Sequence, residues 1–324
     1  MIPLLKGLRV AVVGLVAAGA LSCQAPPPEE KRPAVGAAPA AERAVDPSAP
    51  TLKELQNATY TGVEEAGGPF TLTAGAWEGT PYEPGGASRP SVTLLRDFRL
   101  AGDLDGDGRE EAVVLLAGAT GGTGETSYLA VVRRAATGIE NIATAPVGDR
   151  VQLRDGRLDG TRVVLDVVQG GEKDAGCCPG DLVTRNWELA GGALKEGAPA
   201  TTGRLSIETI GGTEWVLRSW AWDEPAAATP EVTLTLDGNK LVGSAGCNNY
   251  FTAVKAGDSP GDIKPGPIGT TRKMCPEAEM AVEKRFLEQL AGVNQVRFMA
   301  GQLALPYTRK DQSFGVMLFE RRAK

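Results

Sequence analysis

The sequence predicts an α+β protein, mostly β, with two antiparallel-sheet domains and one helix packed on a curved sheet in the C-terminal domain. Short β-branched or alternating runs are separated by clusters of Gly, Pro and Asp, as expected for strands joined by turns. Glycine accounts for 42 of the 324 residues, which is typical of many tight turns. Only one stretch has convincing helical periodicity. The length beyond the N-terminal segment suits two domains.

The chain begins with a segment that is typical of an export signal. Two basic residues, Lys6 and Arg9, precede an apolar run over residues 10–21 that is too short to be a stable bilayer anchor. The run ends in Ala20-Leu21-Ser22-Cys23, which resembles the lipobox of bacterial lipoproteins, although that family prefers Leu where Ala20 stands. The resemblance implies a signal peptide over residues 1–22 and a lipid on Cys23 that binds the membrane. The alternative is an ordinary signal peptide.

Two features of this segment bear on localisation. Gln24 is not the aspartate that, in the lipoprotein family, favours retention in the inner membrane. The resemblance therefore implies a lipid-anchored protein of the cell envelope, in the outer membrane facing the periplasm. Residues 23–50 are rich in Pro and Ala and have no periodic apolar face, so we expect an extended tether there.

Composition excludes several classes of function. The chain has no histidine, which excludes Ser-His and Cys-His nucleophiles and imidazole metal ligands. It has 34 basic and 40 acidic residues and no basic tract, which argues against nucleic acid as a partner. No G-x-S-x-G motif is present, and the adjacent pairs Glu110-Glu111 and Asp223-Glu224 do not form a spaced catalytic dyad. We therefore expect a protein that is not an enzyme.

The predicted N-terminal module spans residues 51–195. Its expected strands cover residues 91–95, 111–116, 127–132, 162–168 and 183–189. A Gly- and Ala-rich stretch over residues 191–204 has little pattern, and we place the domain boundary there.

The second domain begins near residue 205. Alternation on both sides of Asp237-Gly238 predicts a hairpin over residues 231–246. A helix is expected over residues 276–292, with Pro276 in its first position, Gly292 as its C-terminal cap and an apolar stripe of core residues. That stripe comprises Met280, Phe286, Leu287, Leu290 and Val293. Strands over residues 296–299, 302–305 and 315–319 follow, and Trp215, Trp220 and Trp222 are expected in the core or an interface.

Three motifs of this domain appear in a recognisable order. They are Trp215-Val-Leu217, then Gly246-Cys247-Asn248, then Thr271-Arg272-Lys-Met274-Cys275 before the helix. Over about residues 205–322 this pattern resembles the META domain, the family of the bacterial heat-shock lipoprotein HslJ. The resemblance implies a small α+β domain without known catalytic residues, often carried by envelope lipoproteins and linked in some bacteria to the heat-shock response.

A second motif lies in the N-terminal module, where GDLDGDGREE leads into an apolar strand. Calcium takes six to eight oxygen ligands from a sharply folded loop, and this loop offers the side chains of Asp103, Asp105, Asp107 and Glu111 and the carbonyl of Arg109. It resembles the strand–loop–strand calcium motif of FG-GAP and related repeats, with Glu111 in place of the commoner Asp. The single copy argues against a propeller. Two interpretations stay open, a Ca²⁺ site and a charged hairpin turn.

Four cysteines remain if Cys23 carries lipid, and an exported chain meets an oxidising compartment. Cys247 and Cys275 are expected either to form a disulfide or to remain buried thiols. Cys177 and Cys178 are adjacent, and three interpretations stay open: a strained vicinal disulfide, two thiols in a turn, or a Cu(I) site.

Two classes of function follow. The first is a non-enzymatic envelope lipoprotein that acts in binding or stress protection, with an unknown envelope protein or small ligand as its partner. The alternative is a thiol-dependent redox or copper-handling protein that uses Cys177 and Cys178.

Overall fold

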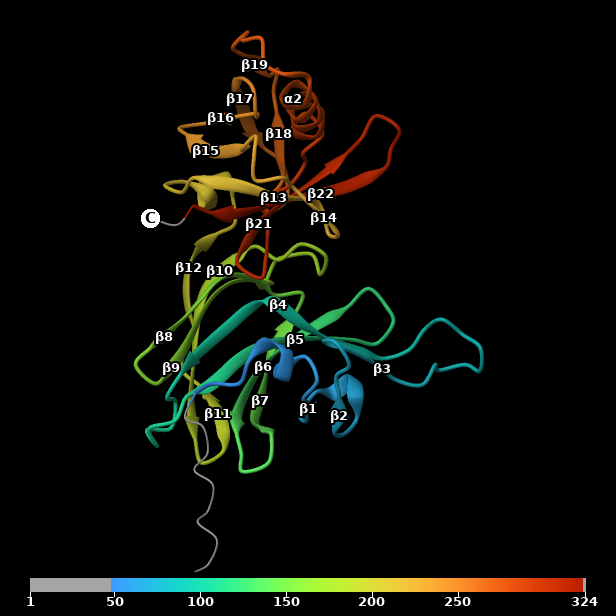
Figure 1. Cartoon of the computed structure of the whole chain (residues 1–324), viewed down its shortest axis with the longest axis vertical. Helices are drawn as coiled ribbons and strands as arrows, with labels where there is room; N and C mark the ends of the chain where they lie inside the picture. Colours follow the sequence, from blue (N-terminus) through green and yellow to red (C-terminus); the bar gives the residue numbers. More distant parts are fainter. Residues whose placement is uncertain (1–47, 323–324) are drawn as a thin grey trace, which may run out of the picture. The chain divides into compact units, whose positions relative to one another are not determined.

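The N-terminal module is built on a five-stranded antiparallel sheet (Figure 1). The computed structural model describes residues 48–322; the predicted signal peptide, Cys23 and most of the predicted tether lie outside the described residues. The strands run in spatial order β3-β4-β5-β6-β7. Their bounds are β3 (Ala76–Glu78), β4 (Ser91–Gly102), β5 (Glu111–Ala119), β6 (Glu125–Arg134) and β7 (Ile139–Asp149). The fold is mostly β, as predicted.

The sequence of strand β5 is almost continuously apolar because both faces of the strand are buried. Ala112, Val114 and Leu116 pack into a core on one face of the sheet. Val113 and Leu115 point to the opposite face and pack into a second core. Successive side chains of a strand alternate between faces, so the residues from Ala112 to Leu116, which are buried on both faces, are all apolar.

A second antiparallel sheet packs across one of these cores. It contains β8 (Gln152–Asp159), β9 (Arg162–Gln169), β10 (Asp181–Ala190), β11 (Ala193–Glu196) and β12 (Ala200–Arg204). Leu165, Val167 and Trp187 are buried against the first sheet. Strands β11 and β12 both pair with β10, so this sheet extends to Arg204, whereas the sequence placed the end of the module at residue 195. These two strands are mostly exposed, which explains why their sequence lacks an alternating apolar pattern.

The outer face of the first sheet is covered by the N-terminal segment of the described chain. This segment contains α1 (Leu52–Leu55), β1 (Thr59–Tyr60), the 3₁₀ turn η1 (Glu64–Ala66) and β2 (Phe70–Thr71). Before α1 the backbone is held by side chains from two strands of the first sheet and from the loop before β5. Arg134 Nε donates to the Ser48 carbonyl and Arg99 Nε to the Pro50 carbonyl, both at 3.0 Å, and the Ala49 amide donates to Glu110 Oε2 at 3.4 Å.

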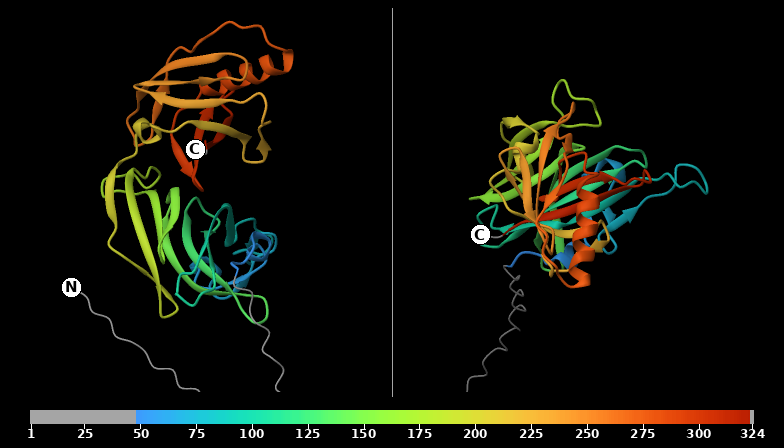
Figure 2. Two further views of the ribbon diagram at one scale, coloured as in Figure 1. Left: turned by 60° about the vertical axis from the view of Figure 1, so that its left-hand side comes forward. Right: turned by 90° about the horizontal axis from the view of Figure 1, so that it is seen from above.

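The C-terminal module is a curved antiparallel sheet with one main helix, as predicted (Figure 2). Its main strand order is β18-β17-β16-β15-β13-β22-β21-β20, with β14 beside β13 and β19 beside β17. The module starts with the 3₁₀ turn η2 (Ile207–Ile210), and its helix is α2 (Glu277–Leu290). Strand bounds are β13 (Trp215–Ala221), β14 (Glu224–Pro225), β15 (Thr233–Asp237), β16 (Lys240–Ser244), β17 (Asn249–Ala256), β18 (Ile263–Pro265), β19 (Gly269–Thr270), β20 (Arg297–Met299), β21 (Gln302–Thr308) and β22 (Phe314–Arg321).

Helix α2 packs on this sheet through the end of its apolar stripe. Phe286 and Leu290 are fully buried, and the Phe286 ring meets Tyr250 edge-on with ring centroids 5.1 Å apart. The prediction was wrong for Met280, which is 43% exposed because it lies in the first turn, before the helix reaches the core. Pro276 is the N-cap residue, so the helix begins at Glu277, one position after the predicted start. No helix within residues 48–322 is both long enough and apolar enough to cross a bilayer.

The two modules meet along β8 and β20. The Phe298 amide donates to the side-chain oxygen of Gln152 at 2.9 Å, and the Gly301 amide donates to the Leu153 carbonyl at 3.1 Å. Val168, from β9, is buried in the same core as the C-terminal strands. The modules are therefore joined by packed side chains and hydrogen bonds as well as by the chain itself.

Candidate functional site

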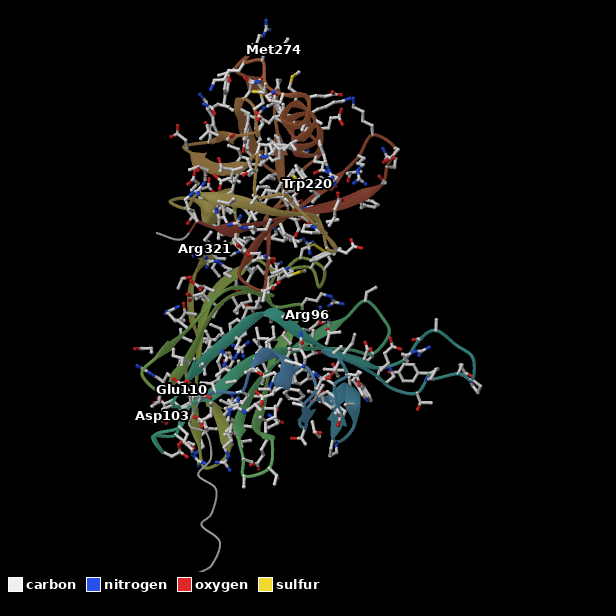
Figure 3. All side chains as sticks on the ribbon, in the orientation of Figure 1. Arg96, Asp103, Glu110, Trp220, Met274 and Arg321 are labelled. Atoms are coloured by element: carbon white, nitrogen blue, oxygen red, sulfur yellow. A yellow bond between two sulfur atoms is a disulfide. The ribbon has the colours of Figure 1, made fainter. Side chains whose placement is uncertain are left out.

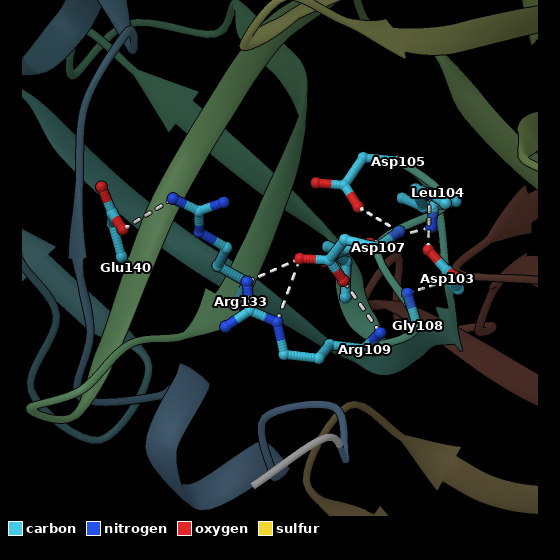
Figure 4. A network of polar contacts seen from close by, with 10 residues as sticks. Asp103, Leu104, Asp105, Asp107, Gly108, Arg109, Arg133 and Glu140 are labelled. Carbon is cyan, nitrogen blue, oxygen red and sulfur yellow. Dashed lines mark hydrogen bonds and ion pairs between the residues drawn. The ribbon is translucent and has the colours of Figure 1, made fainter. Parts of the chain in front are cut away.

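The acidic loop connects β4 to β5 at one end of the first sheet, and Asp103 and Glu110 lie together there in Figure 3. Gly106 and Gly108 both have positive φ, 78° and 84°, which glycine adopts without steric cost and which lets the chain turn sharply. The amide of Gly106 donates to Asp103 Oδ1 at 2.7 Å, and the amide of Gly108 donates to Asp103 Oδ2 at 3.0 Å. These bonds fold the loop around the Asp103 carboxylate (Figure 4).

Three of the predicted carboxylates come together in this loop. Oxygen atoms of Asp103, Asp105 and Glu111 all lie within 4.8 Å of one another. Asp103 is half-buried, Asp105 is exposed, and Glu111 is completely buried at the start of β5. The loop therefore presents one buried and two more accessible carboxylates to a single point.

Glu111 is unusual because its side chain is fully buried, and a fully buried glutamate is rare without a partner. Its Oε2 accepts the Leu104 amide at 2.8 Å, whereas its buried Oε1 has no hydrogen-bond partner within residues 48–322. Burial raises the pKa of Glu111, the Leu104 amide opposes that rise, and the neighbouring aspartates contribute to it.

The fourth predicted carboxylate, Asp107, has a different partner. The guanidinium of Arg109 donates to Asp107 Oδ2 through Nε at 3.0 Å and Nη2 at 2.6 Å, and the Arg109 amide donates to Oδ1 at 2.8 Å (Figure 4). This guanidinium holds the pKa of Asp107 below its usual value. The loop thus neutralises Asp107 internally. The other cation drawn nearby, Arg133, pairs with Glu140 at 3.4 Å.

The second candidate site is a cleft of about 1290 Å³ between the N-terminal sheets and the strands β20, β21 and β22. Its walls are mainly apolar. They include Leu95, Leu115, Val147, Leu153, Leu165 and Val167 from the N-terminal module, and Phe298, Ala304, Pro306 and Val316 from the C-terminal module. On β21 and β22, Ala304 and Val316 belong to a small apolar cluster separate from the main C-terminal core.

Large aromatic side chains also border this cleft. Trp222 is 60% exposed and Phe314 is 81% exposed, so both present apolar surface to solvent beside the cavity. The prediction that Trp215, Trp220 and Trp222 lie in the core or an interface holds for the first two, which are buried. Three polar residues that line the same cleft are hydrogen-bonded to one another: Gln295 donates to Asp262 at 2.8 Å and accepts from Arg297 at 2.6 Å.

The structure joins the four described cysteines in two pairs. Cys247 and Cys275 form a disulfide whose Cα atoms are 5.9 Å apart, and Cys177 and Cys178 are bonded to each other. Cys177 also borders the cleft. Within residues 48–322, only Asp103, Asp105 and Glu111 form a group of three or more potential metal-ligating side chains. Within the described residues, no Cys, Asp or Glu side chain therefore lies close enough to Cys177 and Cys178 to serve as a third metal ligand.

The motif residues of the C-terminal module form a hydrogen-bond network around the buried side chain of Asn248. Its side-chain oxygen accepts from the Thr271 hydroxyl at 2.8 Å and the Lys273 amide at 2.7 Å, and its side-chain nitrogen donates to Glu283 at 3.0 Å. The network joins the turn after β16 to the segment before α2 and to α2 itself. Gly246 takes a positive φ of 106° in that turn, while Arg272 and Met274 point to solvent.

The sequence indicated the acidic loop but not the cleft. Carboxylates at short, regular spacing are visible in a local pattern. The cleft walls come from residues 95 to 316, and no local pattern joins them. The exposed aromatic ring of Phe314, at the start of a strand whose central residues are buried, is the signal that points to this surface.

Comparison with known proteins supports part of this interpretation. Residues 208–321 match the META domain, which confirms the resemblance predicted for the C-terminal module. A similar solved structure, described as the NMR structure of the protein from Burkholderia xenovorans, is 25% identical, with a TM-score of 0.29. The match covers 36% of this chain and 86% of that chain. No curated protein matches the sequence.

Proposed function

We propose that this chain is a non-enzymatic lipoprotein of the bacterial cell envelope that binds a ligand with an apolar body in the cleft between its two modules. The observation that carries this proposal is the cleft itself, with its apolar walls and the exposed rings of Trp222 and Phe314 beside it. Ligand sites are concave and mostly apolar, with a few polar groups that fix orientation. Here the chain formed by Asp262, Gln295 and Arg297 supplies those polar groups.

We propose a non-enzymatic role because the sequence and the cysteine pairing offer few catalytic groups. No histidine is available as a general base, and the cysteines of the described modules are paired with each other. The match to the META domain is consistent with an envelope protein, because proteins that carry this domain are often envelope lipoproteins. The N-terminal export segment and Cys23 support the lipid anchor. A redox or copper-handling role has no comparable support.

Ligand binding is tested with the apolar fluorescent probe 1-anilinonaphthalene-8-sulfonate and purified mature protein. We expect the probe to bind the folded protein and the double variant Trp222→Ala, Phe314→Ala to bind it at least tenfold more weakly. The matched control is Phe251→Ala, since Phe251 is 55% exposed but does not border the cleft. Equal affinity in the wild type and the double variant would contradict the proposal.

The envelope location is tested separately by fractionating cells that express the wild type or Cys23→Ala. We expect the wild type in the membrane fraction with the mobility of a lipidated protein. The variant should be released from the membrane or accumulate as the uncleaved precursor. An unchanged fraction and mobility in the variant would show that Cys23 carries no lipid.

A further inference from the structure

We infer that Asp103, Asp105 and Glu111 bind one Ca²⁺ ion, which fixes the connection between β4 and β5. This inference goes beyond the ligand-binding function proposed above and does not depend on it. It begins with the three carboxylates, whose oxygens lie within 4.8 Å of one another. Like charges at this separation repel each other. A cation at their centre would turn that repulsion into attraction.

The loop's own arginine does not supply this cation. Arg109 directs its guanidinium to Asp107, at 2.6 and 3.0 Å, and Arg133 pairs with Glu140. Neither ion pair includes a carboxylate of the three-residue group. The loop thus balances one of its aspartates internally and leaves the charge of the other carboxylates concentrated at one point.

Glu111 provides an independent observation that indicates a ligand. Its side chain is fully buried, one oxygen accepts the Leu104 amide, and the other oxygen has no hydrogen-bond partner among the residues that the structure describes. A buried polar atom without a partner destabilises the folded state, because it has lost its hydrogen bonds to water. The same side chain is part of the group formed with Asp103 and Asp105. A metal ion bound by these carboxylates would satisfy the buried oxygen at the position where the structure leaves it unpaired.

The ligand atoms select the class of metal. All three side chains offer oxygen, and no nitrogen or sulfur ligand joins the group, which favours a hard cation over Zn²⁺ or copper. Ca²⁺ accepts six to eight oxygens in flexible geometry, so loop carbonyls and water can complete the shell around three carboxylates. Mg²⁺ requires near-ideal octahedral geometry and loses its water reluctantly. We therefore expect Ca²⁺ to bind more tightly than Mg²⁺, with a Kd of about 0.1 to 1 mM, as in extracellular modules.

The test is calcium titration of the mature protein by calorimetry, together with thermal unfolding in EGTA and in about 5 mM CaCl₂. We expect one site per chain and a melting temperature that is about 2 to 5 °C higher with calcium. The variant Glu111→Gln keeps an oxygen that can accept the Leu104 amide but removes the buried charge. It should bind calcium at least tenfold more weakly and should melt in EGTA at or above the wild-type temperature.

The control is Asp159→Asn, which also removes one carboxylate charge from the N-terminal module. Asp159 is exposed, pairs with Arg162 and lies outside the acidic group, so this variant should keep the wild-type calcium response. The inference is overturned if wild-type unfolding is the same in EGTA and calcium and no heat of binding is observed. It is also overturned if Glu111→Gln binds calcium as tightly as the wild type. A variant that is destabilised equally with and without calcium, with its affinity intact, would show that Glu111 has only a structural role.

Discussion

The carboxylate of Glu54 accepts hydrogen bonds from both terminal nitrogens of Arg134, from Nη1 at 2.7 Å and from Nη2 at 2.9 Å. The two residues are 80 positions apart in the sequence. Glu54 also completes the capping box of α1 by accepting the Thr51 amide at 2.8 Å. One side chain therefore fixes the first helix of the described chain both to its own N-terminus and to strand β6.

This pair gives the N-terminal module a stability that depends on pH. The Arg134 hydrogen bonds, supported by those from Thr51 and opposed by desolvation, lower the pKa of Glu54 from 4.5 to about 2. A lowered folded-state pKa stabilises the protein above pH 4.5, and the contribution is lost as the pH falls from 4.5 toward 2. Because the Glu54 side chain is 37% exposed, solvent screening limits the effect to about 1 kcal/mol.

We therefore expect Glu54→Gln to reduce the free energy of unfolding by about 1 kcal/mol at pH 7. The difference from the wild type should shrink as the pH falls from 4.5 toward 2. Urea unfolding at several pH values measures this, with the exposed Glu172→Gln as the control. A difference that does not change with pH would show that the charge of Glu54 is not responsible.

Asn248 is expected to be essential for the stability of the C-terminal module. Replacement by Ala removes the acceptor of the Thr271 hydroxyl and the Lys273 amide and leaves these groups near a buried gap. We expect a loss of about 2 to 3 kcal/mol in the free energy of unfolding, measured with urea. The neighbouring Asn249 is exposed, so Asn249→Ala should cost much less. Similar losses for both variants would contradict the role of the network.

The disulfide between Cys247 and Cys275 is predicted to stabilise the same module. It closes a loop with a sequence separation of 28, for which the chain-entropy model gives about 3 to 4 kcal/mol. The double Ser variant should lose about this much stability, and peptide mapping without reductant should find the two cysteines linked. Replacing Cys177 and Cys178 with Ser should cost far less, because a bond between adjacent residues closes almost no loop. Equal costs would refute this account.

The contacts between β8 and β20 predict how a fragment behaves. A fragment of residues 205–324 should unfold cooperatively, but at lower urea than the same module in the complete chain. It lacks the Gln152 acceptor of the Phe298 amide and the apolar contact of Val168. Gln152→Ala in the complete chain should reproduce part of the loss, about 1 kcal/mol. A fragment without a cooperative transition would show that the C-terminal module depends on the N-terminal one.

Secondary structure was predicted correctly where the sequence has a strong local pattern. The run from Ala112 to Leu116 is apolar because both faces of β5 are buried, and the turn at Asp237-Gly238 joins two strands as its residues indicate. Strand β7 was not predicted, since Pro146 and several polar residues interrupt it. It tolerates them as an edge strand, where part of the backbone needs no partner. Strands β11 and β12 were missed because backbone pairing forms them without apolar burial.

The same distinction applies to the candidate sites. The spacing of Asp103, Asp105 and Glu111 predicted that a loop could gather their carboxylates. It did not predict that Glu111 would be buried with one oxygen unpaired, because burial depends on strands distant in sequence. Nor did the pattern show that Asp107 would be bound by Arg109, since the loop conformation decides which carboxylate the guanidinium reaches.

The three contacts that hold residues 48–50 also determine how the module responds to force. A pull on the chain before Ser48 reaches Arg134 on β6, Glu110 beside β5 and Arg99 on β4 before it reaches α1. The load is therefore shared among two strands of the first sheet and the loop before β5 instead of unwinding a four-residue helix. If the chain were held at its N-terminal end, tension would therefore act on the central strands of the first sheet. These strands would have to separate together before the module could unfold.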